Sequence, residues 1–392
     1  MSDAPVYKSL GVSASKAGLH EALCRAGVAE KQAAFCSLEP DIAGDPSFYF
    51  FMHCDGCGTK SIVSYLQFRE KNDINAFSGL AQDALVMNLD DVFCLGTPQS
   101  LHLVNIINRN ARLIPDDVLG LIISEYHALA KQLEEQGVGI VVSGGESADC
   151  GDIVRTLVVD AIIAGRIERN RLINLERITP GDLIIGLPSS GQAGYEKKIN
   201  SGIGSNGLTL ARHALLSSLY AERYPEISDP CAEARAVTGL HLLTDVLPGT
   251  EMTLAEALCS PTRCFAPVLK EIYARLGAEI HGAIHVTGGG LSKVLRFGRA
   301  NHYIKDNLFP VPPVFSFIQQ AGNISWSEMY QVFNMGQLFE LFVPEKCYTP
   351  LYDILRGFNL EARVIGRVEK SPLGGRNKVT LKTPQGVFDY VL

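Results

Sequence analysis

The sequence predicts an α/β protein with mixed α+β layers, arranged in two domains. Apolar strand-like runs alternate with segments of helical periodicity along the chain, which is typical of α/β and α+β folds. The 392 residues are 46% hydrophobic, which is enough material for more than one core. The sequence contains no low-complexity tract or short repeat, so a globular protein is expected.

The first predicted strand, "FYFF", leads into the polar run "MHCDGCGTKS". Gly56 and Gly58 allow a tight backbone, Thr59 and free N–H groups can face oxyanions, and Lys60 adds a positive charge. Asp55 suits a magnesium ion. The run lacks the spacing of a Walker A loop, so an ordinary glycine turn and a phosphate site both remain open.

A helix is predicted for "FSGLAQDALVMNLDDVFCLG". Asp83 and Asp90 are seven residues apart and fall about 20° from each other on a helix, with Asp91 on the flank. These acids form either a solvated face or a buried set that needs cations, because the remaining residues are largely apolar. Magnesium with nucleotide phosphates would satisfy Asp55, Asp91 and Glu146 together.

The next helix is predicted to start at Pro115 and stop at Gly137. Its apolar stripe consists of Leu119, Ile122, Ile123, Tyr126, Leu129, Ala130 and Leu133.

The segment "VGIVVSGGESAD" is predicted as a buried strand that runs into Gly144, Gly145 and Glu146. The two glycines let a ligand approach the backbone, and the glutamate places a carboxylate at the end of the strand. The apolar run "TLVVDAIIAGRI" is expected to pair with this strand.

A domain boundary is predicted at the polar start of "RITPGDLIIGLPSSG", which divides the chain into residues 1–178 and 179–392. The second part carries "SNGLTLARHALL", "IHVTGGGLSKVLRF" and "MYQVFNMGQLFELFV". Each of these segments joins a Gly- or Asn-containing turn to a strand or a helix.

Charge and hydropathy narrow the class of protein. The net charge is −7 and the basic residues are scattered, which argues against a nucleic-acid partner. The sequence does not begin with the charged segment and following apolar segment that are typical of a signal peptide. No uncharged apolar run approaches the roughly 18 residues of a membrane helix. A cytoplasmic protein without a membrane partner is therefore expected.

Eight segments carry a family resemblance, and they follow one another in the family's order: "DGCGTK", "AQDALVMNLDDV", "GIVVSGGESAD", "GDLIIGLPSSG", "SNGLTLAR", "SPTRCFAPV", "HVTGGGL" and "EMYQVFNMG". From "YKSLGV" to about residue 370, the chain resembles the aminoimidazole ribonucleotide synthetase family, also called phosphoribosylformylglycinamidine cyclo-ligase. The resemblance implies two α/β domains, a homodimer built through paired N-terminal sheets, and an ATP cleft near the interface that the C-terminal domain covers.

The resemblance also implies an activity. The family uses ATP and Mg²⁺ to close the ring of formylglycinamidine ribonucleotide, giving aminoimidazole ribonucleotide, ADP and phosphate in de novo purine synthesis. ATP phosphorylates the amide oxygen, and a neighbouring nitrogen then displaces phosphate from the iminophosphate. By this likeness the catalytic residues are Lys60, Asp91 and Glu146, and the metal ligands are Asp55, Asp91 and Glu146.

The other matched positions form two groups. The nucleotide-facing group is Asp55, Gly56, Gly58, Thr59, Lys60, Gly144, Gly145, Asn206 and Gly207. The substrate-facing group is Arg263, Thr287, Gly288, Gly289 and Gly290. Plainer interpretations are an ion pair for Arg263 and a sharp turn for the glycines after Thr287.

The chain also departs from the family pattern. The Gly- and Phe-rich loop before the first strand is replaced by "FCSLEPDIAGDPSF", and Gly204 stands where the family has a histidine. His213, His241 and His285 are the candidate substitutes for that histidine.

An insertion at residues 192–204 carries Tyr195, Lys197 and Lys198, which form either a lid that contacts phosphate or a solvated loop. Two alternative functions remain: a related small-molecule kinase, such as thiamine monophosphate kinase, and a non-catalytic ligand-binding paralogue.

Overall fold

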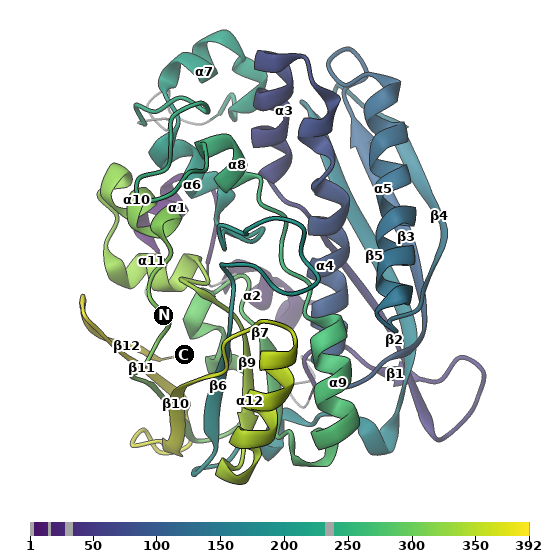
Figure 1. Cartoon of the computed structure of the whole chain (residues 1–392), viewed down its shortest axis with the longest axis vertical. Coiled ribbons are helices and arrows are strands. Elements are labelled where there is room, and N and C mark those ends of the chain that lie inside the picture. Colours follow the sequence, from purple (N-terminus) through teal and green to yellow (C-terminus); the bar gives the residue numbers. More distant parts are fainter. Residues whose placement is uncertain (1–3, 15–16, 28–33, 232–238, 392) are drawn as a thin grey trace.

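The chain forms two β-sheets with helices packed around them, which confirms the predicted α/β class (Figure 1). The computed structural model describes residues 4–14, 17–27, 34–231 and 239–391. The first sheet has the strand order β1-β2-β5-β3-β4. Its strands are β1 (Glu39–Pro40), β2 (Phe48–Gly56), β3 (Gln99–Arg109), β4 (Ile140–Asp149) and β5 (Leu157–Glu168).

Helices of the N-terminal part cover one face of this sheet. α4 packs on β2 and β5, and α5 packs on β4, beside the sheet in Figure 1. The N-terminal part of the chain contains the helices α1 (Pro5–Ser9), α2 (Ala17–Arg25), α3 (Lys60–Lys71), α4 (Leu80–Phe93) and α5 (Asp116–Glu135), of which α4 and α5 cover most of this face. The two long helices with acidic residues therefore form where the sequence predicts them.

Helix α5 shows why the sequence folds locally as it does. Asp116 and Asp117 lie in its first turn, where carboxylates favour the positive end of the helix dipole. Gly137 has φ +81°, a backbone conformation that ends a helix without strain only at glycine. The buried residues are Val118, Ile122, Tyr126, Ala130 and Leu133.

The second sheet belongs to the C-terminal part and has the order β12-β11-β8-β10-β6-β9-β7. Its strands are β6 (Leu183–Pro188), β7 (Gly282–His285), β8 (Asn301–Lys305), β9 (Gln337–Val343), β10 (Arg363–Lys370), β11 (Lys378–Thr383) and β12 (Gly386–Val391). The helices of this part are α6 (Leu208–Leu215), α7 (Ser218–Arg223), α8 (Leu254–Leu258), α9 (Ala266–Leu276), α10 (Pro313–Gly322), α11 (Trp326–Val332) and α12 (Tyr348–Gly357). The predicted boundary at residue 178 falls between β5 and β6 and stays a prediction.

Two predictions about the first sheet are wrong. β4 is an edge strand with mostly exposed residues rather than a buried strand. β5 pairs with β2 and β3 rather than with β4. β4 pairs with β3 instead. Because β3 and β5 lie between them, β4 is far from β2 in the sheet.

The face of the first sheet opposite α4 and α5, here called the outer face, carries apolar residues that stay exposed. Met52 and His102 both pair with Ala164, and His102 pairs with Val141, so the four lie in one row on this face. Met52 is 60% exposed and Val141 is 56% exposed. Within the described residues, no helix has the length and hydropathy needed to cross a membrane.

Candidate active site

The carboxylate of Asp91 lies where the two parts of the chain meet. Asp91 is buried near the end of α4, and its Oδ1 accepts a hydrogen bond of 2.7 Å from Nδ1 of His285, at the end of β7. Its Oδ2 lies 3.4 Å from Nε2 of His53, on β2. One strand from each sheet and helix α4 therefore converge on this carboxylate.

The surroundings keep Asp91 ionised. Burial alone would raise the pKa of Asp91, but Lys293, the hydrogen bond from His285 and the nearby His53 outweigh it and lower the pKa to about 2. Lys293 lies in the 3₁₀ helix Gly290–Arg296, and its Nζ donates to Oγ1 of Thr287 at 2.5 Å. The site thus holds a fixed negative charge beside a lysine.

The neighbouring Asp90 has a different role. Its carboxylate accepts hydrogen bonds from the backbone N–H groups of Phe265 and Ala266, at the start of α9. Burial raises the pKa of Asp90 to about 7, although those N–H groups favour the charged form. Asp90 therefore joins α4 to α9 rather than facing the site of Asp91.

This raised pKa predicts a pH effect on stability. Between about pH 4 and pH 7, folded Asp90 keeps a proton that the unfolded chain releases, so stability falls as the pH rises through this window. Asp90→Asn removes that dependence. Chemical unfolding at pH 5 and at pH 8 measures this effect. The free energy of unfolding of Asp90→Asn, relative to that of the unaltered protein, should be higher at pH 8 than at pH 5. An equal difference at the two pH values would mean that Asp90 is ionised throughout.

The predicted phosphate turn follows β2 and precedes α3. Gly56 has no room for a side chain, because a Cβ there would lie 1.7 Å from Oδ1 of Asp160. Thr59 is joined to the C-terminal part through its Oγ1, 2.9 Å from Oγ1 of Thr209. The turn at Gly58 and Thr59 therefore borders α6.

A cavity of about 510 Å³ borders this turn and contains basic residues. Its lining includes Gly58, Thr59, Thr209, Arg155 and Arg212. Arg212 is buried, its Nε donates no hydrogen bond to any atom in the described part of the chain, and burial lowers the pKa of Arg212 to about 10. Its Nη1 donates to the backbone carbonyl of Ile227 at 3.0 Å, so part of the guanidinium of Arg212 is already engaged beside this cavity.

Acids also line this cavity, but other donors already engage them. Glu226 accepts from Tyr65 and Arg69, and Asp229 accepts from the backbone N–H of Cys231. Of the candidate histidines, His213 lines the same cavity, whereas His241 lies beside Asp245.

The Asn206 and Gly207 turn comes close to the glycines after Thr287. A Cβ on Gly288 would lie 3.8 Å from Nδ2 of Asn206. Gly207 has φ +80°, and a Cβ there would meet the ring of Phe333 at 2.3 Å. The structure thus brings these predicted positions together near Lys293.

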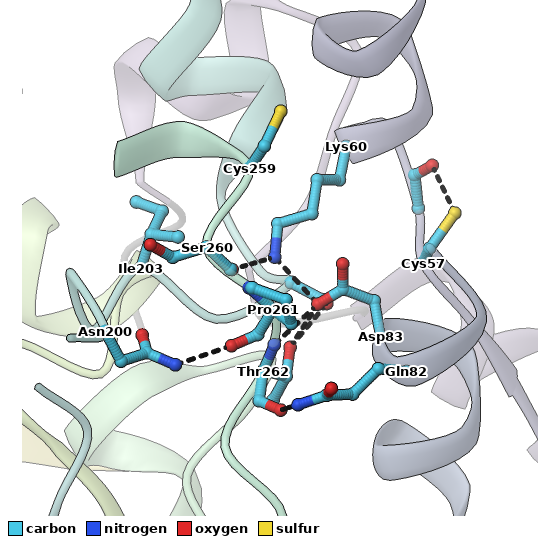
Figure 2. A network of polar contacts seen from close by, with 12 residues as sticks. Cys57, Lys60, Gln82, Asp83, Asn200, Ile203, Cys259, Ser260, Pro261 and Thr262 are labelled. Carbon is cyan, nitrogen blue, oxygen red and sulfur yellow. Dashed lines mark hydrogen bonds and ion pairs between the residues drawn. The ribbon is translucent and has the colours of Figure 1, made fainter. Parts of the chain in front are cut away.

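The structure corrects the predicted position of Lys60. Its side chain is fully buried, and its Nζ donates to Oδ1 of Asp83 at 2.7 Å and to the carbonyl of Ser260 at 2.6 Å (Figure 2). Oδ1 of Asp83 also accepts from the backbone N–H and hydroxyl of Thr262. Lys60 therefore stands in a network that joins α3 and α4 to the 260–262 loop, because burial demands a partner for its charge.

The structure also corrects the placement of Glu146. Glu146 is exposed on edge strand β4 and pairs with Ile106, and Ile106 pairs with Asp160 on the outer face. Asp91 lies on the helix-covered side, so one chain does not gather Asp55, Asp91 and Glu146. Gly144 and Gly145 border a separate cavity of about 300 Å³ beneath α5.

The structure places Arg263 in an ion pair, which is the plainer of its two interpretations, and not toward an open site. Its guanidinium is buried and donates to both carboxylate oxygens of Glu196, at 2.9 and 2.7 Å. It also donates to the backbone carbonyls of Pro188, Ser190 and Gly191. All five of its N–H groups are used, so Arg263 anchors the insertion.

The insertion is packed rather than simply solvated. Tyr195 donates to the carbonyl of Cys264 at 2.6 Å and its ring packs edge-on against Phe358. Lys197 and Lys198 remain exposed and line a groove of about 290 Å³ against α4 and α5.

Sequence reasoning missed His53, Asn88 and Lys293. The alternation of a strand gives one signal, since His53 and Asp55 are two residues apart and share a face. Asn88 precedes Asp91 by three residues and lies on the same side of α4. No local pattern indicates Lys293, because its approach to Asp91 depends on the fold.

Two family models match the chain: the N-terminal domain of AIR synthase related protein over residues 33–167, and its C-terminal domain over residues 264–377. A phosphoribosylformylglycinamidine cyclo-ligase of Thermococcus gammatolerans is 30% identical, over 83% of this chain and 81% of its own length. The chain belongs to the AIR synthase family. The resemblance stated from the eight segments is thus confirmed.

A second relative agrees with this assignment, and one solved structure shares the fold. A phosphoribosylformylglycinamidine cyclo-ligase of Methanocaldococcus jannaschii is 28% identical over 86% of this chain and 82% of its own length. AaThiL, solved with AMPPCP and TMP, has a TM-score of 0.54 at 12% identity, covering 95% of this chain and 96% of that one. At 12% identity, the likeness to AaThiL concerns the fold alone.

Proposed function

We propose that the chain is an ATP-dependent phosphoribosylformylglycinamidine cyclo-ligase that works in purine biosynthesis. The observation that carries the proposal is the ionised carboxylate of Asp91, held by His285 and His53 beside Lys293 where the two parts meet. The chain with this site belongs to the AIR synthase family. Two relatives that it matches over most of their length are named phosphoribosylformylglycinamidine cyclo-ligase.

The chemistry asks the protein mainly to position groups and balance phosphoryl charge. ATP phosphorylates the amide oxygen of formylglycinamidine ribonucleotide, and a ring-forming nitrogen then displaces phosphate from the iminophosphate. The turn at Gly58 and Thr59, with Arg155 and Arg212 across the cavity, is suited to phosphate oxygens. Lys293 supplies a further positive charge beside Asp91.

Magnesium would be held by Asp91, with Asp55 nearby on β2. The donor set fits this ion, because Mg²⁺ is usually bound by one or two carboxylates together with phosphate oxygens. When bound, it neutralises charge on the transferred phosphoryl group. The hydrogen bond from His285 holds the Asp91 carboxylate in one orientation.

Incubation with ATP, Mg²⁺ and formylglycinamidine ribonucleotide tests the proposal. We expect aminoimidazole ribonucleotide to form with one ADP for each ring, and no product without ATP. Equal cyclisation without ATP would contradict the mechanism. ADP release without ring closure would indicate a kinase-like relative, and nucleotide binding without turnover a non-catalytic paralogue.

We further propose that two chains associate through the outer face of the first sheet. This face exposes Met52 and Val141 in one row, and an uncovered apolar sheet face favours association. It also presents Glu146, so a second chain placed there can bring that carboxylate toward the first chain's site.

Met52→Lys is expected to separate this dimer, because it places a charge at the β2 end of this row, on the face that the two chains would bury. Light scattering at micromolar concentration should give twice the 42.5 kDa of one chain for the unaltered protein and a single-chain mass for the variant. Leu240→Lys, an exposed position in the C-terminal part, is the matched control. A single-chain mass for the unaltered protein would refute the dimer.

A further inference from the structure

A groove that the proposed function does not use lies between residues 195–200 of the insertion and helices α4 and α5, and is here called the insertion groove. Its volume is about 290 Å³, near the lower limit for pockets that hold small molecules. None of its described lining residues also lines the cavity beside Gly58 and Thr59, and Asp91 lines neither. The insertion groove is therefore separate from the candidate active site.

The wall that the insertion contributes is held in place without a ligand. Nδ2 of Asn200 donates to the carbonyl of Pro261 at 2.7 Å (Figure 2). The hydroxyl of Tyr195 donates to the carbonyl of Cys264 at 2.6 Å, and Glu196 is held by its buried ion pair. Because this wall is already ordered, a ligand that binds against it loses little affinity to the ordering of the protein.

The inside of the insertion groove is largely apolar. Leu85 of α4, Leu129 and Leu133 of α5, and Pro261 line it. Ile199 also lines it, and 63% of this side chain remains exposed. Apolar walls of this kind bind the apolar part of a small molecule.

Two glutamines give the insertion groove unused hydrogen-bonding groups. Gln132 and Gln136 both line it and are four residues apart on α5, so they share one side of that helix. Both are partly buried, and neither side-chain amide is hydrogen-bonded to another residue in the described part of the chain. Each amide offers a donor and an acceptor, the combination with which glutamine binds the edge of an adenine ring.

The charged residues of the insertion groove favour an anionic ligand. Lys197 and Lys198 are exposed, and neither forms an ion pair within the residues that the structure describes. The chain has a net charge of −7, so two adjacent lysines at a groove form a local site for a negative group. Of the two acids in the lining, Glu196 is engaged by Arg263, and Glu125 can accept a hydrogen bond from an amino group on the ligand.

We propose that the insertion groove binds a purine nucleoside monophosphate. The base lies between the apolar walls with its edge on the amides of Gln132 and Gln136, and the phosphate lies against Lys197 and Lys198. The lining runs along α5 from Glu125 to Gln136, roughly 16 Å of helix, which suits an elongated nucleotide better than a compact ligand such as an amino acid. This binding does not rest on the proposed function.

A ligand in the insertion groove contacts a loop that is tied to α4. The hydroxyl and backbone N–H of Thr262 donate to Asp83, and the backbone N–H groups of Phe265 and Ala266 donate to Asp90. The nucleotide is therefore placed as an effector, and we expect its binding to slow amide hydrogen exchange in residues 261–266.

Photolabelling of the full chain with 2-azidoadenosine 5′-monophosphate tests the proposal, because mass spectrometry of the labelled peptides separates one site from another. We expect label within residues 117–136 or 192–204. Lys197→Glu combined with Lys198→Glu should raise the half-saturating concentration of this label at least ~10-fold. Lys370→Glu combined with Lys382→Glu is the matched control, at exposed positions of β10 and β11 outside the groove, and should change it less than about twofold.

Competition in the unaltered chain gives a result that does not depend on the folding of a variant. AMP should displace the label from these peptides at concentrations at least ~10-fold lower than adenosine or ribose 5-phosphate, since each of these lacks one half of the ligand. Equal competition by adenosine, label confined to peptides that line the cavity beside Gly58 and Thr59, or unchanged labelling of the lysine variant would overturn the inference. Displaceable label at the insertion groove of a chain that makes no aminoimidazole product would uphold the inference while the proposed function fails.

Discussion

Lys60→Met is expected to lower the free energy of unfolding by about 3–5 kcal/mol, because it leaves the buried carboxylate of Asp83 without its cation. The ammonium of Lys60 is 2.7 Å from Oδ1 of Asp83, and the other oxygen, Oδ2, is buried with no partner found in the described part of the chain. Methionine fills a similar volume, so the loss is mainly electrostatic. Urea unfolding measures it.

Two further variants separate this charge effect from general disruption. Lys60→Met combined with Asp83→Asn should recover more than half of the lost stability, since no uncompensated charge remains. Lys197→Met, at an exposed position of the insertion, should change stability by less than about 0.5 kcal/mol. A Lys60→Met protein with unchanged stability but abolished use of ATP would restore the role that the sequence suggests for Lys60, contact with phosphate.

The sequence located the acids of α4 but not their partners. Helical spacing placed Asp83, Asp90 and Asp91 along a largely apolar helix, and the structure buries all three. The spacing could not show that each acid has its own partner. His285 is 194 residues away from Asp91 along the chain, and such pairings depend on how the two parts pack.

The order of the strands in the first sheet could not be predicted from the sequence either. The apolar run before Gly144 fits a buried strand and an edge strand equally well, because local hydropathy does not say which strands flank it. The edge position of β4 moved Glu146 away from Asp91. Arg263 was similarly misplaced, since its partner Glu196 lies in the insertion, for which the family pattern offers no counterpart.

The position of Glu146 leads to the prediction with the largest effect on activity. Asp91→Asn and Glu146→Gln are each expected to lower turnover by at least ~10²-fold. In the proposed function both carboxylates balance charge on the phosphoryl group or its metal, Glu146 from the partner chain, and each substitution removes that charge while keeping the volume. Asp90→Asn is the matched control and should retain most activity, since Asp90 bonds the start of α9 instead. Circular dichroism verifies that each variant is folded.

Mixing the two inactive variants then distinguishes one chain from two. If Glu146 acts on the partner's Asp91 site, random exchange of subunits makes half of the dimers mixed, and each mixed dimer has one site with both acids intact. Activity should return to about a quarter of the unaltered value after exchange, and neither variant alone should recover. Failure to recover, with exchange verified by tagged subunits, would mean that Glu146 either acts within its own chain after a rearrangement or has no part in the reaction; the activity of Glu146→Gln alone decides between these, because only a residue outside the reaction leaves turnover intact.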